Sequence, residues 1–401
     1  MKVEFSPPDI TELEIQEVAD ALRSGWITTG KRTKRFEDEI ARYCGTEKSV
    51  CLNSATAALE LTLRILGIGP GDEVITSAYT YTATVSVICH VGARPVLVDV
   101  KKDSYEMDYD QVEQAITEKT KAIIPVDLGG ILCDYDRIFS IVEQKKPIFI
   151  PRHAMQEKFN RIIVIADAAH AFGATRKGLT CGNIADFTCF SFHAVKNLTT
   201  GEGGAVTWRH ITEIDSDALY RQYMLYSLHG QSKDALAKTQ LGAWEYDIML
   251  PGYKCNMTDV TAAIGLVQLA RYPEMLEKRR KIISRYLVGL GERNLQFAPH
   301  YTSSSTSSGH LFLVRMEGQQ REIRDRVIQD MASKGISTNV HYKPLPMHTA
   351  YRRMGFSIDE YPNSYRQFEN EITLPLHTKL TDEEVEFVID EFTEIIQRIG
   401  L

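Results

Sequence analysis

Between residues 49 and 208 the chain alternates short β-rich runs with helical segments, and this alternation constrains its fold more than any other feature. Runs such as "SVCLN", "DEVITS" and "RIIVIAD" are separated by helical stretches such as "SATAALELTLRIL". This order is typical of an α/β domain with a mostly parallel sheet. The runs are apolar on both faces, which indicates a sheet covered by helices on each side.

Helical patterns flank this region. "TELE" at Thr11–Glu14 resembles a capping box, and a second amphipathic pattern ends at Gly45. After residue 250 we expect one helix in "TDVTAAIGLVQLARY", with Thr258 as its N-cap, and a separate helix in "PEMLEKRRKIISRYLVGL". The strand "LFLVRM" and two later helices follow, and "YTSSSTSSG" predicts a mobile surface loop. We predict a large domain over residues 1–250 and a small α+β domain over residues 251–401.

The composition excludes several classes of protein. The 401 residues carry a net charge of −7, so no basic surface is available to bind nucleic acid or anionic lipid. No apolar stretch is long enough for a transmembrane helix, and no signal region opens the chain, so we expect a cytoplasmic protein. The seven cysteines form no CxxC pair, which argues against a zinc or redox site and fits a reducing compartment. We expect no metal site.

Two motifs follow predicted strands with polar groups suited to a ligand. In "NSATAAL" small residues begin a helix directly after a strand, which leaves free N–H groups that favour an anion. The alternative is an ordinary capped helix. In "IIVIADAAHAFGA", Asp167 ends an apolar strand, where ligands bind in open α/β sheets, and His170 lies three residues on. The alternative for Asp167 is a helix cap, and for His170 a polar residue satisfied at a domain edge.

Two further motifs offer a nucleophile and an aromatic face. In "FSFHAVKNLTTGEGGAV", Lys196 follows a strand of aromatic residues, with Ser191 close by. A lysine among apolar groups loses its proton readily and serves as a nucleophile or base, although most lysines are solvated surface residues. In "YTYTATV", Tyr79 and Tyr81 offer rings that can stack on a flat ligand, with core packing as the alternative.

Together these four features match the needs of pyridoxal phosphate. Its phosphate needs helix-terminal N–H groups, its pyridine nitrogen a carboxylate, its aldehyde a lysine, and its ring an aromatic neighbour. The combination predicts a pyridoxal-phosphate enzyme.

The sequence resembles the DegT/DnrJ/EryC1/StrS sugar aminotransferases, whose fold is that of aspartate aminotransferase. The resemblance covers nearly the whole chain and includes "GWITTGKRTKRFE", "DAAHAFGA", "SFHAVKNLTTGEGG", "GYKCNMTDVTAAIGLVQL" and "VHYKPLPMHTAY". It implies fold type I of the pyridoxal-phosphate transferases, an α/β fold in which a large domain with a seven-stranded, mostly parallel sheet precedes a small α+β C-terminal domain. It also implies a homodimer with shared active sites.

The resemblance further implies roles for individual residues. Lys196 would bind the cofactor aldehyde and later move the proton of the substrate carbon. Asp167 would pair with the pyridine nitrogen, with Tyr81 stacked on the ring and His170 beside it. The remaining residues would bind the cofactor phosphate (Ser54, Ala55, Thr56 and Ser191) or lie near the sugar nucleotide (His341).

The motif "GYKCNMTD" would reach the partner subunit's phosphate. Many relatives read GxNxR at this point, so Lys254 takes the place of the asparagine and Asn256 that of the arginine. Either residue is a candidate for the phosphate contact.

The implied reaction moves the amino group of L-glutamate, which leaves as 2-oxoglutarate, to a nucleotide-linked keto sugar. A UDP-4-keto-6-deoxy sugar is the expected acceptor, with a 3-keto sugar or a TDP or GDP carrier as alternatives. A dehydrating or deoxygenating branch of the family carries histidine in place of Lys196, which argues against that chemistry here. The third alternative, a binding protein without catalysis, has no need for the lysine.

The stretch "KKPIFIPRHAMQEKFN", at residues 145–160, is longer than in most relatives. It is either a peripheral elaboration, which we favour, or a flap at the site mouth that offers Arg152 and His153 to an anionic substrate.

Overall fold

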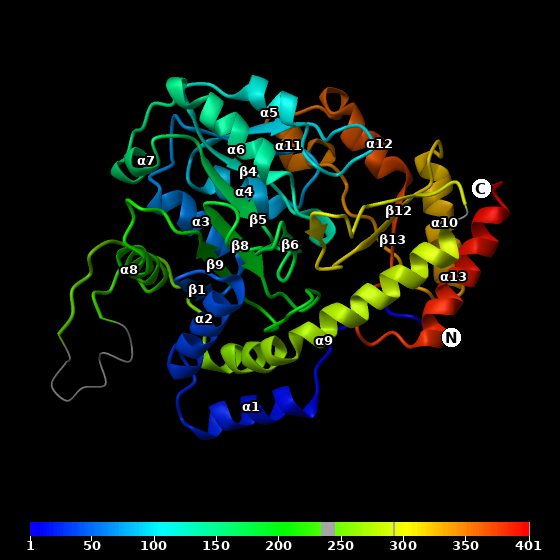
Figure 1. The fold of residues 1–401 in the computed structure, drawn as a ribbon, viewed down its shortest axis with the longest axis horizontal. Coiled ribbons are helices and arrows are strands. Elements are labelled where there is room, and N and C mark those ends of the chain that lie inside the picture. The colour runs from blue at the N-terminus through cyan, green and yellow to red at the C-terminus, as the bar shows by residue number, and fades with distance from the viewer. Residues whose placement is uncertain (234–244, 292, 401) are drawn as a thin grey trace.

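The structure is a computed structural model that describes residues 1–233, 245–291 and 293–400. Its centre is a seven-stranded sheet, and Figure 1 shows this sheet between layers of helices. Six strands run in one direction, and β9 (Gly204–Trp208) is antiparallel to both of its neighbours. The strand order is β1 (Ser49–Leu52), β9 (Gly204–Trp208), β8 (Phe187–Ser191), β5 (Ile163–Asp167), β4 (Thr120–Ile124), β2 (Glu73–Ser77) and β3 (Arg94–Val98). The predicted seven-stranded, mostly parallel sheet is confirmed.

Successive side chains of the central strands enter different cores, because neighbours along a strand point to opposite faces. In β5, Ile163 and Ile165 belong to one core, and Val164 and Ala166 to the other. The first core packs against α3 (Ala55–Ile65), α4 (Thr82–His90), α7 (Ala154–Phe159) and α8 (Ser216–Ser227). The second packs against α2 (Lys31–Cys44), α5 (Tyr109–Ala115), α6 (Tyr135–Gln144) and the first half of α9 (Asp259–Leu290).

The C-terminal part has a third core of its own, with β10, β12 and β13 forming an antiparallel sheet. Val3 from the N-terminal segment also belongs to this core. The elements of this part are β10 (Gln296–Phe297), β12 (Phe312–Arg315), α10 (Arg321–Ser333), α11 (Thr349–Arg353), α12 (Pro362–Asn370), β13 (Glu371–Leu374) and α13 (Asp382–Gln397). The domain boundary at residue 250 stays a prediction.

Helix α9 corrects one prediction. The two helices expected on either side of Pro273 form one continuous helix of 32 residues, which Figure 1 shows running beneath both parts of the molecule. Tyr272 and Met275, next to the proline, are buried in the second core, whereas Ile283 and Tyr286 enter the third. Packing on both sides of Pro273 therefore offsets the hydrogen bond that proline cannot donate within the helix.

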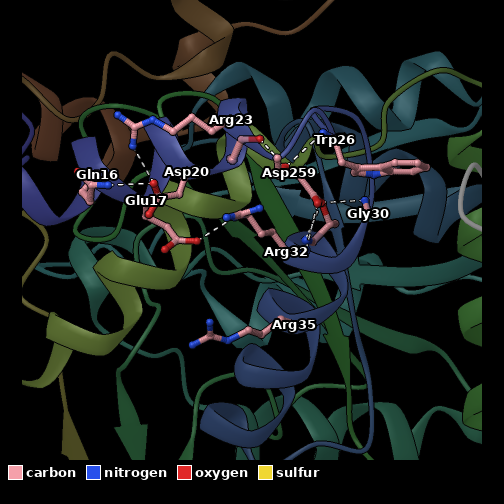
Figure 2. A network of polar contacts seen from close by, with 12 residues as sticks. Gln16, Glu17, Asp20, Arg23, Trp26, Gly30, Arg32, Arg35 and Asp259 are labelled. Carbon is pink, nitrogen blue, oxygen red and sulfur yellow. Dashed lines mark hydrogen bonds and ion pairs between the residues drawn. The ribbon is translucent and has the colours of Figure 1, made fainter.

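The start of α9 is fixed to the start of α2 by a carboxylate, shown in Figure 2. Oδ1 of Asp259 accepts hydrogen bonds from the backbone N–H groups of Gly30 and Thr33, at 2.8 and 2.9 Å, and Oδ2 accepts one from Arg32 N at 3.1 Å. Arg32 in turn pairs with Glu17 of α1 (Glu12–Arg23), at 2.8 Å. Position 30 requires glycine, because a Cβ atom would lie 2.0 Å from the indole nitrogen of Trp26.

Capping chemistry predicted from the sequence is present in the structure. Thr11 and Glu14 form the capping box of α1, Gly45 ends α2 with a left-handed φ of 71°, and Thr258 caps α9. All seven cysteines are free thiols. No helix within the described residues has the length and apolar composition needed to cross a bilayer.

Candidate active site

A cavity of about 980 Å³ opens at the edge of the sheet where the parallel strands end. Most of the predicted site residues line it, although they come from segments far apart in the sequence. The residues that the structure brings together here are Ser54, Ala55, Thr56, Tyr81, Asp167, His170, Ser191, Lys196 and His341.

Lys196 lies in the turn between β8 and β9, where its N–H donates to the carbonyl of His193 at 2.9 Å. Its side chain is only partly exposed and faces a cavity with largely apolar walls. Burial lowers the pKa of Lys196 to about 8, and the negative charge of Asp167 offsets part of this shift. Near physiological pH the neutral amine, which is the form that acts as a nucleophile or base, is therefore more abundant than in an ordinary lysine.

Asp167 is the last residue of β5 and is 6% exposed. Burial raises the pKa of this carboxyl, while hydrogen bonds from Thr84 and Ala169 and the charge of Lys196 act in the opposite direction. The Thr84 hydroxyl donates to Oδ2 at 2.7 Å, and the Ala169 N–H donates to Oδ1 at 3.2 Å. These donors orient the carboxylate at the bottom of the cavity.

An anion cradle lies at the start of α3. Ser54 caps the helix by accepting the N–H of Ala57 at 3.1 Å, and the N–H groups of Ala55 and Thr56 have no partner among the described residues. The backbone at Gly204 approaches so closely that a Cβ there would lie 2.4 Å from Ala55 N. Free helix-terminal donors bind phosphate groups well, so these residues fit the phosphate of pyridoxal phosphate.

The two tyrosines of "YTYTATV" have different places. Tyr81 precedes α4, lines the cavity and is 60% exposed, so its ring is available to a flat ligand. Tyr79 is 1% exposed and packs against Tyr105, and its hydroxyl donates to the carbonyl of His341 at 2.9 Å. For Tyr79 the alternative of core packing is confirmed.

His170 belongs to a cluster of aromatic side chains that the sequence did not predict. Its Nδ1 accepts the N–H of Gly129 at 3.2 Å, and its Nε2 faces the hydroxyl of Tyr342 at 3.1 Å. The ring of His310 lies 4.3 Å from that of His170, between centroids. Burial and the nearby Lys196 hold the pKa of His170 well below its usual range, so the ring is neutral.

The segment "YTSSSTSSG" is a surface loop only in part: residues 302–304 are exposed, whereas residues 307–309 are buried. Part of it forms β11 (Ser305–Thr306), which pairs with β6 (Thr175–Arg176); β6 in turn pairs with β7 (Leu179–Thr180). Ser308 is 1% exposed, and its hydroxyl donates to the carbonyl of His170 at 2.5 Å. The side chains of Ser305, Ser307 and Ser308 are bonded to protein, and a local composition of small polar residues does not reveal this.

The residues that sequence reasoning missed are His310, Tyr342 and Asn197. Asn197 Oδ1 lies 2.9 Å from Nδ1 of His310, and its amide donates to Ser308 O at 2.8 Å. Tyr342 directly follows the predicted substrate residue His341, which was the one signal for it. His310 follows the serine-rich segment, and no pattern there distinguishes it from a loop residue.

Lys254 and Asn256 lie outside the lining of this cavity. They contact each other, and the Asn256 amide also donates to the carbonyl of Met257 at 3.3 Å. Their expected contact with the partner subunit's phosphate stays a prediction.

The extra segment at residues 145–160 contributes no residue to the lining of the cavity and packs against the loop at residues 66–72, which precedes β2. Arg152 pairs with Asp72 at 3.1 Å, Gln156 donates to Leu66 O at 2.9 Å, and His153 packs on Gly67. The flap alternative is therefore wrong for this chain, and the peripheral elaboration is confirmed.

Comparison with known proteins agrees with this geometry. Residues 8–393 match the model of the DegT/DnrJ/EryC1/StrS aminotransferase family. The chain is 36% identical to the spore coat polysaccharide biosynthesis protein SpsC of Bacillus subtilis, covering 98% of this chain and 97% of SpsC.

Solved structures are similar over the whole chain. A protein described as a sugar aminotransferase, Spr1654 of Streptococcus pneumoniae, is 57% identical in its PMP form, with a TM-score of 0.97 over 99% of this chain and all of that one. The same protein has been solved in its PLP form. PseC of Helicobacter pylori, described as an aminotransferase of pseudoaminic acid biosynthesis, is 25% identical, with a TM-score of 0.86 over 99% of this chain and all of PseC.

The fold, the cavity with its lysine and carboxylate, and the match over nearly the full length lead to one assignment. The chain belongs to the DegT/DnrJ/EryC1/StrS aminotransferase family and is an aminotransferase whose cofactor is pyridoxal phosphate.

Proposed function

We propose that this protein transfers the amino group of L-glutamate to the keto group of a nucleotide-linked sugar, most specifically a UDP-4-keto-6-deoxy sugar. The observation that carries the proposal is the pairing of a lysine of lowered pKa, Lys196, with the buried carboxylate of Asp167 in one cavity. We place the reaction in the cytoplasm, in a homodimer.

Different residues around the cavity would hold different parts of the cofactor. Pyridoxal phosphate, when bound, supplies an electron sink that allows the bond between carbon and hydrogen next to the donor nitrogen to break. Asp167 would keep the pyridine nitrogen protonated, the start of α3 and Ser191 would bind the phosphate, and Tyr81 would cover one ring face.

Lys196 would then move the proton. Its neutral amine accepts the proton from the donor carbon, and the resulting ammonium returns it on the other side of the exchange. Because the pKa of Lys196 is about 8, the amine exchanges between its neutral and its protonated form near neutral pH, as both transfers require. The same lysine speaks against deoxygenation, for which the resemblance implies histidine at this position.

The size and walls of the cavity support a sugar acceptor. A volume of about 980 Å³ lies at the upper end of typical small-molecule sites, so it has room beyond the cofactor. His341 and Lys343 line the wall contributed by the C-terminal part. The names of SpsC and PseC point to polysaccharide and sugar-acid biosynthesis, which supports a sugar substrate here.

The positions of Lys254 and Asn256 support a homodimer. Lys254 and Asn256 match a family motif for the cofactor phosphate, yet they lie outside the cavity of their own chain. A second copy could bring these residues to the phosphate cradle.

The first experiment is the visible spectrum of the purified protein with pyridoxal phosphate. Wild type should absorb in the visible range, lose this band with L-glutamate and regain it with 2-oxoglutarate. Lys196→Ala should show no such cycle, whereas Lys177→Ala, at an exposed turn outside the cavity, should behave as wild type. A wild-type band that L-glutamate leaves intact would contradict the donor assignment.

The acceptor is tested with the amine-loaded protein and a panel of keto-sugar nucleotides. The UDP-4-keto-6-deoxy sugar should restore the band fastest. Faster restoration by a 3-keto sugar, or by a TDP or GDP carrier, would replace the acceptor in this proposal.

A further inference from the structure

His341 projects one edge of its ring into the protein and lines the cavity with another. Its ring stacks on Phe5, with centroids 5.7 Å apart, and meets Tyr342 edge-on at 4.9 Å. Nδ1 lies 2.9 Å from the hydroxyl oxygen of Thr373, whereas Nε2 has no hydrogen-bond partner in the part of the chain that the structure describes. Nε2 is therefore the nitrogen available to a ligand.

The carboxyl group of Glu371 contacts both Thr373 and His341. Glu371 and Thr373 are both 0% exposed and stand two residues apart on β13, on the same face of the strand. The Thr373 hydroxyl lies 2.5 Å from Oε1 of Glu371, and the backbone N–H of His341 donates to Oε2 at 2.9 Å. Two backbone hydrogen bonds between Asn339 and Thr373, of 3.1 and 2.8 Å, fix the register of the two segments.

With Glu371 ionised, the donor and the acceptor of each hydrogen bond in this chain are fixed. Both carboxylate oxygens can only accept, so the Thr373 hydroxyl donates its proton to Oε1. The Thr373 oxygen then accepts from His341, which requires the ring proton on Nδ1. Nε2 is left with a lone pair and presents an acceptor to the cavity.

With Glu371 protonated, the polarity reverses. Oε2 still accepts the N–H of His341, so the proton sits on Oε1 and is donated to the Thr373 oxygen. The Thr373 hydroxyl then donates to Nδ1 of His341, and the ring proton moves to Nε2. His341 now presents a donor to the cavity.

We propose that Glu371, acting through Thr373, is a positioning residue that selects the tautomer of His341 and so decides whether His341 donates to or accepts from the bound sugar. The tautomer itself follows from the hydrogen bonds of this chain alone. The identification of the ligand as a sugar rests on the proposed function.

The charges around Glu371 allow this titration. Burial raises the pKa of Glu371 to about 8, against the opposing hydrogen bonds of Thr373 and of the His341 N–H and the positive charge of Arg324 on α10. The other titratable groups near it are the tyrosines at 79, 105 and 342, whose pKa values are raised, so they are neutral in this range. Burial and Lys196 lower the pKa of His341 to about 3, so its ring stays neutral and only its tautomer changes.

The tautomer can be read directly by nitrogen NMR of histidine-labelled protein, with His341→Asn used to assign the signals. In wild type the bare nitrogen should pass from Nδ1 to Nε2 as the pH rises through the pKa of Glu371. In Glu371→Gln the amide oxygen accepts the His341 N–H, so the NH₂ group faces Thr373 and the proton should stay on Nε2 throughout. A wild-type tautomer that is independent of pH, or a variant that titrates like wild type, overturns the proposal.

Kinetics supply a second readout. In wild type the ratio of kcat/KM for the keto sugar to kcat/KM for the amino donor should change about tenfold across this pH range, the effect of one gained or lost hydrogen bond. Glu371→Gln should abolish the change, and Glu369→Gln, the same substitution on α12 outside the cavity, should keep it. A pH response that survives in Glu371→Gln contradicts the proposal.

Two substitutions at Thr373 distinguish loss of the hydrogen bond from misfolding of a variant. Thr373→Ser keeps the hydroxyl and should keep the tautomer change. Thr373→Val removes the hydroxyl and should abolish the change, and a cooperative thermal transition shows that the variant is folded even though the lost buried hydrogen bonds lower its Tm. A tautomer change that persists in the valine variant overturns the relay. Because these NMR experiments need no substrate, they decide on Glu371 even if no sugar nucleotide is accepted.

Discussion

The hydroxyl of Thr84, on helix α4, donates a 2.7 Å hydrogen bond to Oδ2 of Asp167 at the end of strand β5. Thr84 is fully buried, so this bond is made without competition from water. Burial raises the pKa of Asp167, and the Thr84 bond opposes that shift. The ionised carboxylate that the cofactor's pyridine nitrogen needs is therefore maintained partly by a threonine from another element.

Replacing Thr84 by valine should weaken cofactor binding. The substitution removes a hydrogen bond to a charged group, worth about 1.5–3 kcal/mol, so the Kd for pyridoxal phosphate should rise about 10-fold or more. Titration of the apo protein by fluorescence measures this Kd. Thr84→Ser retains the donor and should bind nearly as wild type, and an equal loss in both variants would point to packing rather than to the hydroxyl.

The capture of pyridoxal phosphate by apo protein should depend on pH through Lys196. Only the neutral amine attacks the aldehyde, so the association rate should rise with pH and level off above the pKa of about 8. In Asp167→Asn the negative charge that raises the pKa of Lys196 is lost, so the midpoint should move to lower pH. Stopped-flow absorbance gives both profiles, and a midpoint that moves upward in the variant would contradict this account.

Asp259 should matter for stability rather than for catalysis. Its carboxylate satisfies three backbone N–H groups at the start of α2, so Asp259→Ala should lower the free energy of unfolding by about 2–4 kcal/mol. Denaturant unfolding measures this loss. Glu17→Gln, which breaks only the partly exposed pair with Arg32, should cost less than about 1 kcal/mol.

The extra segment offers a contrast between two of its side chains. Arg152 is more than half exposed, so Arg152→Ala should change the free energy of unfolding by less than about 1 kcal/mol and leave the sugar KM unchanged. Phe159 is 8% exposed in a core, so Phe159→Ala should cost about 3–5 kcal/mol. A raised KM in Arg152→Ala would revive a role at the site.

Much of the fold was predictable because its signals are local. The apolar strands, the capping box of α1, the N-cap Thr258 and the glycine that ends α2 each depend on a few neighbouring residues, and all are where the sequence indicates. The continuity of α9 was not predictable, because a proline stops a helix by local rules and only packing on both sides of Pro273 overrides them.

In the candidate site, too, some features were predictable from local sequence and others were not. Lys196 follows β8 and Asp167 ends β5, and parallel strands bring their ends to one edge, so the meeting of these two residues in one cavity could be inferred. His310 and Tyr342 come from the C-terminal part, and their approach to His170 depends on how that part packs on the sheet. No local pattern in the sequence encodes that packing.

The single helix α9 has a consequence for how the molecule melts. Its first half is a wall of the core beneath the sheet, and its second half is a wall of the C-terminal core. Because unfolding of either core would expose half of α9, the two cores should unfold together in one cooperative transition. Calorimetry should then show one heat-absorption peak. A substitution such as Ile283→Ala in the C-terminal core should lower the temperature at which the central sheet unfolds as well.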